Sequence, residues 1–311
     1  MNFVAKQKNR MYVIGVPSLL LSAVLTAFSQ VFYANRVQTL HPFLFTGVSF
    51  FITTLFFQLV ASKQKVTVQW KFARAPLVKL NIASVLAFMG FYFALKYIEP
   101  AIVSSLEMGL GPLFALLLAA GQKGDVDKRQ WAVALGTFGA CLLLIVSVFT
   151  GSSALESWDR NSVIGIIASI FCGFGAVLCT TYSKQLSEVG WTSSMILAKR
   201  FYGIILLSLL ATYDMLFAYL TQHITWIAAM TAIGVLLPMY LLQKGIQYCE
   251  VFIVMMSLCF IPVFTFIFQL FDSRLHWSNS TFIGVILLLL LGVASVYIKR
   301  REKDEMKEQG L

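Results

Sequence analysis

The stretch ALKYIEPAIVSSLEMGLGPLF, residues 94–114, joins two apolar segments through a short polar break. A second stretch, KGIQYCEVFIVMMSLCFIPVF at residues 244–264, has the same order of apolar segment, polar break and apolar segment. Pro112 and Pro262 each lie twelve residues beyond the break, and each is followed by an apolar residue and then Phe. These shared offsets indicate an internal repeat.

The composition around these stretches is that of a membrane protein. The 311 residues are 59% hydrophobic and 12% charged, with a mean hydropathy of +0.80. A soluble domain has about 25% charged residues, so this chain lacks the polar surface of a water-soluble globule. A helix that crosses a bilayer needs about 20 apolar residues. We therefore predict an all-α polytopic membrane protein with ten transmembrane helices, approximately at residues 12–33, 42–61, 77–96, 101–120, 131–150, 162–183, 194–213, 224–244, 251–271 and 281–298.

The distribution of basic residues predicts the orientation of these spans. With the first span retained and the N-terminus in the cytoplasm, 20 of the 24 Lys and Arg residues fall on the inner side. Arg36, Lys96, Arg160 and Arg274 remain on the outer side. Because positive charge is concentrated on the cytoplasmic side of membrane proteins, this bias predicts a multi-pass membrane protein with both termini cytoplasmic.

The spans divide into two halves of five. We predict a first repeat at 1–156, a second at 157–298, and a basic and acidic cytoplasmic tail at 299–311. Because five is odd, the halves cross the membrane in opposite directions, as two inverted five-helix repeats. Secondary transporters are often built in this way, with the substrate site near the midplane between the repeats.

These features resemble the drug/metabolite transporter superfamily, specifically its EamA-type members. The most similar part is spans 3–4, where ALKYIEPAIVSSLEMGLGPLFALLLA combines a helix-ending AL-x-Y, a short turn and a Pro-containing helix. Spans 8–9 fit more loosely. The resemblance implies a central cavity lined by the first four spans of each half, with spans 5 and 10 peripheral. It also implies transport of a metabolite such as an amino acid or a drug.

Glu107 is the acidic residue that lies well inside a predicted span. A charged side chain there costs about 2.5–3.5 kcal/mol on insertion scales, so we expect Glu107 to face a cavity or a partner. Ser104, Glu107 and Gly111 share a helical face, which suits a hydrated cavity. Two roles are open for Glu107: proton coupling with substrate binding, or a structural carboxylate that is hydrogen-bonded to a neighbouring helix.

Other polar and aromatic residues are candidates for substrate binding, each with a structural alternative. Lys96 can pair with Glu107 or a substrate carboxylate, or reach the interface. Arg200 can bind an anion or anchor the inner edge. Pro112 and Pro262 are expected to bend their spans and act in gating. The remaining candidates are Gln30, Tyr33, Tyr92, Tyr202, Tyr240 and Ser257.

The leading functional hypothesis is a secondary active exporter that moves a small metabolite, either an amino acid or an amphipathic compound, out of the cell by alternating access. In this hypothesis it lies in a bacterial inner membrane, and Glu107 couples transport to protons. An importer of a scavenged metabolite, and a non-transporting membrane sensor or enzyme, are the alternatives. The expected partners are a small-molecule substrate and the lipid bilayer, with no nucleic acid. Gly284 and Gly292 share a face that could form a homodimer. The sequence contains neither H-E-x-x-H nor a Walker A motif, and we expect no enzyme activity, metal or cofactor.

Overall fold

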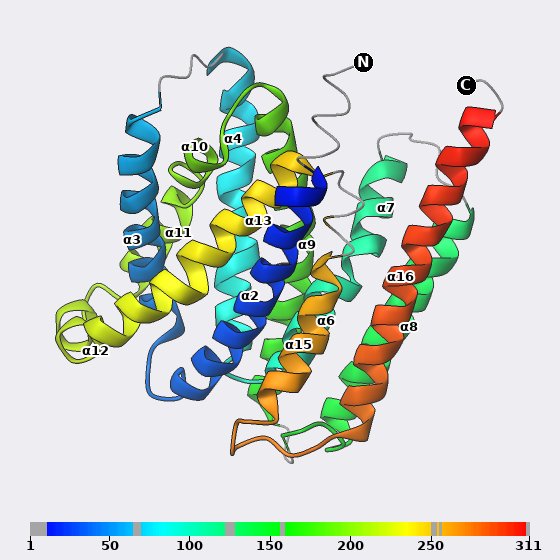
Figure 1. Ribbon diagram of the computed structural model, residues 1–311. Coiled ribbons are helices and arrows are strands. Elements are labelled where there is room, and N and C mark those ends of the chain that lie inside the picture. Colours follow the sequence, from blue (N-terminus) through cyan, green and yellow to red (C-terminus); the bar gives the residue numbers. More distant parts are fainter. Residues whose placement is uncertain are drawn as a thin grey trace.

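The computed structural model describes residues 11–64, 70–121, 128–155, 159–249, 254 and 257–308, and the described residues form helices and connecting turns (Figure 1). Eight helical segments are long and apolar enough to cross a membrane. Two shorter apolar helices, Phe260–Gln269 and Asn279–Ala294, follow them. The chain is thus an all-α polytopic membrane protein. The ten segments follow the predicted order, and the length criterion supports eight of them as spans.

The spans are built from the following helices. Span 1 is α2 (Val16–Arg36), span 2 is α3 (Pro42–Ser62), and span 3 is α4 (Trp70–Ser84), a π-helical segment (Val85–Met89) and α5 (Gly90–Ala94). Span 4 is α6 (Pro100–Gly109) with α7 (Gly111–Gly121), span 5 is α8 (Lys128–Phe149), and span 6 is α9 (Arg160–Glu188). Span 7 is α10 (Ser193–Leu197) with α11 (Tyr202–Ala211). Span 8 is α12 (Leu216–Met230), a π-helical segment (Thr231–Leu236) and α13 (Leu237–Tyr248), and α15 (Phe260–Gln269) and α16 (Asn279–Glu308) belong to spans 9 and 10.

Local sequence signals explain where several of these helices begin. Pro42 and Pro100 occupy the first turn of α3 and α6, where the missing proline N–H costs no hydrogen bond. Asp159 forms a capping box with Ser162 at the start of α9. The long spans therefore begin at residues that favour a helix start.

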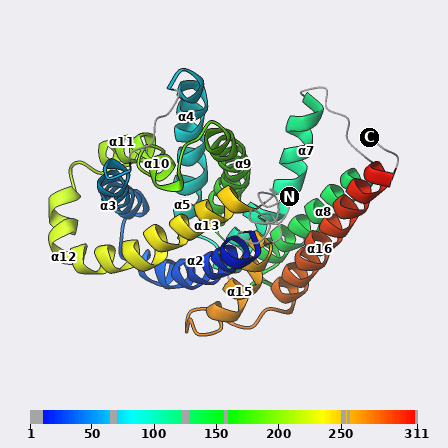
Figure 2. The same ribbon diagram turned by 45° about the horizontal axis from the view of Figure 1, so that its top comes forward.

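The helix packing has a two-fold exchange symmetry between the halves. Spans whose numbers differ by five, such as spans 3 and 8, are counterparts in the two halves. When each span is exchanged for its counterpart, the α4–α9 contact becomes the α13–α2 contact, and the α6–α9 contact becomes the α15–α2 contact. The α3–α11, α6–α15 and α8–α16 contacts each map onto themselves. The start of α2 and the end of α16 lie at the same end of the bundle, and α8 and α16 pair at one side of it (Figures 1 and 2). This is the packing that an inverted repeat implies, and the limits of the repeats at residues 156 and 298 stay a prediction.

Irregular backbone follows the same symmetry. Spans 3 and 8 each contain a π-helical segment, Val85–Met89 in span 3 and Thr231–Leu236 in span 8. Spans 4 and 9 leave the helical conformation at Leu110 and Cys259, shortly before Pro112 and Pro262. Proline removes a backbone donor and clashes with the preceding turn, which accounts for both interruptions. The predicted bends are present, and their gating role stays a prediction.

Two parts of the sequence interpretation differ from the structure. Span 8, predicted to begin at residue 224, begins with α12 at Leu216, so that His223 lies inside the helix. Gly111 begins α7 after the interruption at Leu110, so it does not share a continuous helix with Ser104 and Glu107.

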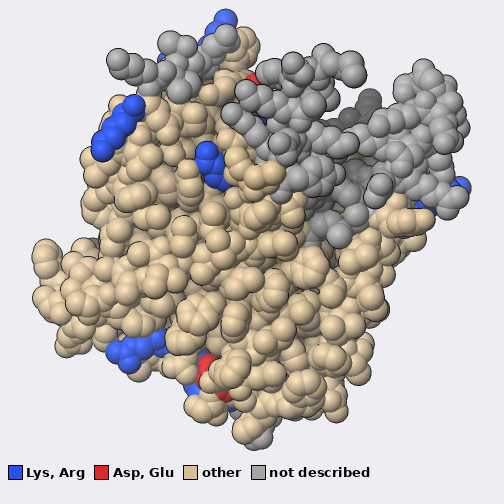
Figure 3. All heavy atoms as spheres, viewed as in Figure 1, with Lys and Arg blue, Asp and Glu red and all other residues tan. Residues whose placement is uncertain are grey.

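The exposed surface is consistent with a bilayer. On the face shown in Figure 3, Lys, Arg, Asp and Glu side chains gather towards the two ends of the bundle and leave a band between them. Large apolar side chains such as Phe217, Leu59 and Leu210 are among the most exposed in the molecule. Such a band would be unfavourable in water and matches the hydrocarbon region of a membrane.

Close packing of spans 3 and 6 yields a first prediction. A Cβ atom added at Gly175 of α9 would lie 2.5 Å from the backbone nitrogen of Ala87 and 2.9 Å from the backbone oxygen of Ala83. Gly175→Ala therefore has to push two backbones apart, and we expect it to destabilise the protein by about 1–3 kcal/mol. The measurement is the thermal unfolding midpoint of purified protein in detergent.

Gly139 of α8 provides the matched control, because a Cβ added there meets no atom within 4 Å. Gly139→Ala should leave the unfolding midpoint unchanged or raise it, since alanine favours a helix over glycine by up to about 1 kcal/mol. Equal midpoints for Gly175→Ala and Gly139→Ala would contradict the backbone contact between spans 3 and 6.

Candidate functional site

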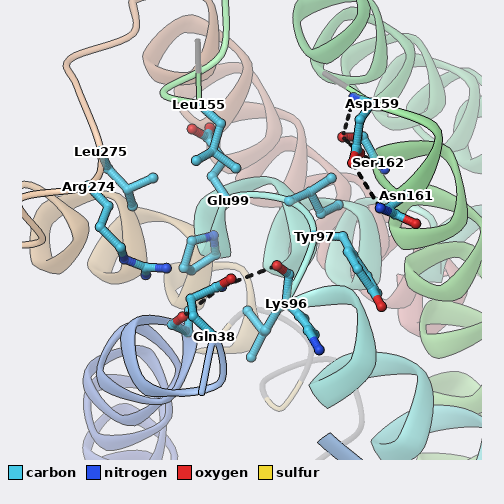
Figure 4. A pocket seen from close by; sticks show the side chains of 14 residues that line it. Gln38, Lys96, Tyr97, Glu99, Leu155, Asp159, Asn161, Ser162, Arg274 and Leu275 are labelled. Atoms are coloured by element: carbon cyan, nitrogen blue, oxygen red, sulfur yellow. Dashed lines mark hydrogen bonds between the residues drawn. The ribbon is translucent and has the colours of Figure 1, made fainter. Parts of the chain in front are cut away.

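A cavity of about 480 Å³ opens at the end of the bundle opposite to the start of α2 and the end of α16. Arg274 extends towards the middle of this cavity, and Asp159, Asn161 and Ser162 line the opposite wall (Figure 4). The lining comes from the end of span 1, the turn between spans 3 and 4, the start of span 6 and the turn after α15, through residues Ala34, Gln38, Leu95, Lys96, Tyr97, Ile98, Glu99, Pro100, Leu155, Asp159, Asn161, Ser162, Arg274 and Leu275. Both halves of the chain therefore contribute to one polar cavity, which we call the outer cavity.

Glu99 is the buried acid of the outer cavity, with 1% of its surface exposed. Its Oε2 accepts a hydrogen bond from the backbone nitrogen of Ala154 at 2.7 Å, and its Oε1 accepts one from the Thr281 hydroxyl at 2.5 Å. Burial raises the pKa of Glu99 to about 7, although both hydrogen bonds favour the ionised form. This carboxyl thus connects the start of α6, the segment between the halves and the start of α16.

Sequence reasoning placed Glu99 only in a polar turn. The one available signal was an acidic residue directly before the proline that starts a helix. Its partners Ala154 and Thr281 are far away in sequence, so their hydrogen bonds depend on the tertiary fold. Lys96, by contrast, was singled out, and it lies at the outer cavity with its Nζ 5.9 Å from the centre of the Tyr97 ring.

An aromatic cluster continues inward from the outer cavity. The Tyr33 hydroxyl donates to the backbone oxygen of Tyr92 at 3.4 Å, and the two rings are 4.8 Å apart. Phe45 packs against both tyrosines, and Phe50 contacts Tyr92. The structure therefore brings the predicted residues Tyr33 and Tyr92 together, in a closely packed interior.

Glu107 lies beside span 6. Its carboxyl is in hydrogen-bond contact with the Cys172 thiol, and a Cβ added at Gly173 would lie 3.1 Å from the Glu107 backbone oxygen. Glu107 is partly buried, and it precedes the helix interruption at Leu110 by three residues. Ser104, predicted on the same face, is buried and donates its hydroxyl to the backbone oxygens of its own helix. Glu107 thus faces the chain interior and a neighbouring helix.

Gln30 is the second polar residue held between the halves. Its amide nitrogen donates to the Thr265 hydroxyl of α15, and its Oε1 is buried without a hydrogen-bond partner. Ser22 and Ser29 of the same span donate to the backbone oxygens of Pro238 and Gly234 at 2.8 and 3.2 Å. The polar face of span 1 therefore bonds to span 8 through its serines and carries one open acceptor.

The other predicted residues lie further apart. Arg200 is 3% exposed, and its Nε donates to the Ser84 hydroxyl of span 3 at 3.3 Å. Tyr240 stacks on Phe57 with a ring distance of 5.8 Å. Tyr202 is 45% exposed and accepts a hydrogen bond from Gln58, which places it on the outside of the bundle.

The remaining predicted residues add little to this interior. Ser257 is buried near the start of span 9. Gly284 and Gly292 face Leu144 and Cys259 of the same chain, so their face is already occupied. Among the described residues, no group of three His, Cys, Asp or Glu side chains could hold a metal ion.

The buried carboxyl of Glu99 yields a prediction for pH dependence. Because the pKa is raised from 4.5 to about 7 in the folded protein, the native state holds this proton more tightly than the unfolded chain. The resulting stability, at most about 3 kcal/mol, is present below about pH 4.5 and is lost as the pH rises through about 7. Glu99→Gln should flatten the thermal unfolding midpoint across this window. An unchanged pH dependence in the variant would contradict the assignment.

Comparisons with known proteins agree with this architecture. The sequence model of the EamA-like transporter family matches residues 13–146. No curated protein matches the chain, whereas 21 chains of solved structures do. One of them, titled "Crystal structure of protein", aligns with 92% of this chain and 98% of its own, with a TM-score of 0.58 and 17% identity, and shows a shared fold. Residues 13–146, which hold the first predicted repeat, thus match the EamA-like transporter family, part of the drug/metabolite transporter superfamily that the sequence resembled.

Proposed function

We propose that this transporter exports a small metabolite, either an amino acid or an amphipathic compound, across an inner membrane by alternating access, with Glu107 as the proton-coupling residue. The observation that carries the proposal is the position of Glu107, which faces Cys172 between spans 4 and 6 at the level where span 4 is interrupted. An acidic side chain at such a depth is costly and is found where an ion or substrate pathway needs it.

The irregular helices around Glu107 support a conformational change of these spans during transport. The π-helical segments of spans 3 and 8 and the interruptions of spans 4 and 9 lie in spans that the two-fold exchange relates. Transporters with inverted repeats change access by moving one repeat against the other around a site near the midplane. Helices with such interruptions can bend at defined points, which suits this movement.

The surroundings favour a substrate with an apolar part. The aromatic cluster of Tyr33, Phe45, Phe50 and Tyr92 lies between the outer cavity and the interior. Gln30 adds a buried amide oxygen without a hydrogen-bond partner, at the place where span 1 meets α15. A substrate that has both polar and apolar groups would match this combination better than a fully hydrated ion.

The orientation is proposed from the positive charges. The predicted inner side carries 20 of the 24 Lys and Arg residues, at the end where α2 starts and α16 ends. Cytoplasmic termini follow from this bias. Export is the direction proposed, and an importer of a scavenged metabolite uses the same architecture.

Flux into reconstituted vesicles tests the proposal. Vesicles with wild-type protein and a labelled panel of amino acids and amphipathic amines should accumulate at least one solute when a pH gradient is imposed. Glu107→Gln should lower this gradient-driven accumulation at least about tenfold, because the amide cannot titrate, while exchange between labelled and unlabelled solute continues. Glu188→Gln, the same change at an exposed residue of α9, is the control and should behave as wild type.

Two results would overturn the proposal. If wild-type vesicles neither accumulate nor exchange any member of the panel, a sensor with a sealed interior becomes the better account. If solute moves and is equally driven by the gradient in Glu107→Gln, transport stands and the coupling role of Glu107 is wrong.

A further inference from the structure

Span 7 is a place where the two halves differ in backbone structure. Its helix stops after Leu197 and starts again at Tyr202, so residues 198–201 form a non-helical break. The corresponding span of the first half, α3, runs without interruption from Pro42 to Ser62. No proline lies in the break. The two-fold exchange therefore does not explain it, and neither does proline chemistry.

One side chain satisfies the backbone of this break. Asn81 of α4 donates its Nδ2 to the backbone oxygen of Lys199 at 2.9 Å and accepts from the backbone nitrogen of Gly203 at 3.2 Å. In the hydrocarbon region, non-helical backbone persists only where protein groups replace its missing hydrogen bonds. The sequence thus provides a dedicated partner for the break, which makes it a stable part of the fold.

The break positions a buried cation. Arg200 is 3% exposed, and its guanidinium carbon lies 5.4 Å from the centre of the Phe88 ring and 5.2 Å from that of Phe201. Its Nε donates to Ser84, and the Cys179 thiol is also in hydrogen-bond contact with it. Two aromatic rings, a hydroxyl and a thiol therefore surround the guanidinium.

No carboxylate neutralises Arg200 among the described residues. Arg274, in contrast, forms an ion pair with Asp272 at 2.6 Å. Glu107 is the nearest candidate by position, but it contacts Cys172 whereas Arg200 contacts Cys179. These cysteines are seven residues apart on α9, which corresponds to about 10 Å of helix rise. No ion pair joins Glu107 and Arg200 among the described residues.

We propose that Arg200, held at the break of span 7, binds the carboxylate of the transported substrate, a proposal that rests on the transport function above. A buried charge without an ion-pair partner is unfavourable, and the carboxylate of an entering substrate would neutralise the guanidinium. The guanidinium offers a planar fork of donors that matches a carboxylate. Phe50 packs on Phe88 and Phe201 at ring distances of 4.9 and 4.5 Å, so an apolar group of a substrate bound to Arg200 would meet aromatic side chains.

The separation of Glu107 and Arg200 divides their roles. Glu107 and Arg200 contact different thiols of α9, at Cys172 and Cys179. Arg200 then holds the carboxylate, and Glu107 remains available for the proton. The substrate class is an organic carboxylate with an apolar or aromatic body, entering from the end at which α10 begins.

Two matched pairs of probes test this site: phenylacetate against phenylacetamide, and hexanoate against hexanamide. The readout is the concentration dependence of the thermal unfolding midpoint of the purified full-length protein, which reports binding by mass action. For wild type, we expect both carboxylates to raise the midpoint and both amides to bind at least about tenfold more weakly.

Variants assign the binding to Arg200. Arg200→Gln should weaken carboxylate binding at least about tenfold, and Arg200→Lys should weaken it less, because the charge remains but the fork is lost. If Arg200→Gln does not fold, the loss of affinity in Arg200→Lys still tests whether Arg200 binds the carboxylate. Lys199→Gln removes the neighbouring charge, whose Nζ lies over Trp70 at 5.5 Å, and should bind as wild type.

The anion site is overturned if neither carboxylate shifts wild type at millimolar concentration, if the amides bind as tightly as the carboxylates, or if both Arg200 variants retain wild-type affinity. These failures are separate from a failure of transport. Vesicle flux of a neutral or cationic solute that Arg200→Gln leaves unchanged would keep the transport function and remove the anion site alone.

Discussion

The requirement to pair every backbone polar group inside a bilayer governs this structure. Each departure from regular helix in the described spans has to be covered by protein. Asn81 bonds to both sides of the break in span 7, and Ser22 and Ser29 bond to carbonyls beside the π-helical segment of span 8. Because such partners come from neighbouring spans, the irregular segments concentrate where helices of the two halves meet. That region also contains Glu107 and the buried Arg200.

The near-symmetry of the halves makes their differences informative. The π-helical segments of spans 3 and 8 and the interruptions of spans 4 and 9 correspond, which suits two repeats that move as equivalent bodies. The break around Arg200 has no counterpart in α3. Glu107 likewise corresponds to Ser257 in the aligned repeat. Symmetric features therefore suit the mechanics of alternating access, and asymmetric ones suit the chemistry of one substrate.

The sequence predicted the features that depend on hydropathy and proline. The ten apolar runs, the order of helices and the bends near Pro112 and Pro262 follow from local composition. It did not predict Glu99 as a buried acid, nor the break of span 7. Both depend on partners remote in sequence, Ala154 and Thr281 for Glu99 and Asn81 for the break. Tyr202, a candidate for substrate binding, is 45% exposed on the outside of the bundle, as its alternative role in the interfacial aromatic belt would have it.

The central claim is that the region between Glu107 and Arg200 is part of a path that opens to water during the transport cycle. Cys179 lies there, in contact with Arg200 and 3.6 Å from the Ser84 hydroxyl. The direct measurement is labelling of a variant that retains only Cys179 with a membrane-impermeant thiol reagent, applied to either face of sealed vesicles. The account predicts labelling from the face at which α10 begins, with slower labelling when a bound carboxylate fills the site. A thiol that stays unlabelled from both faces in a variant that still transports would contradict it.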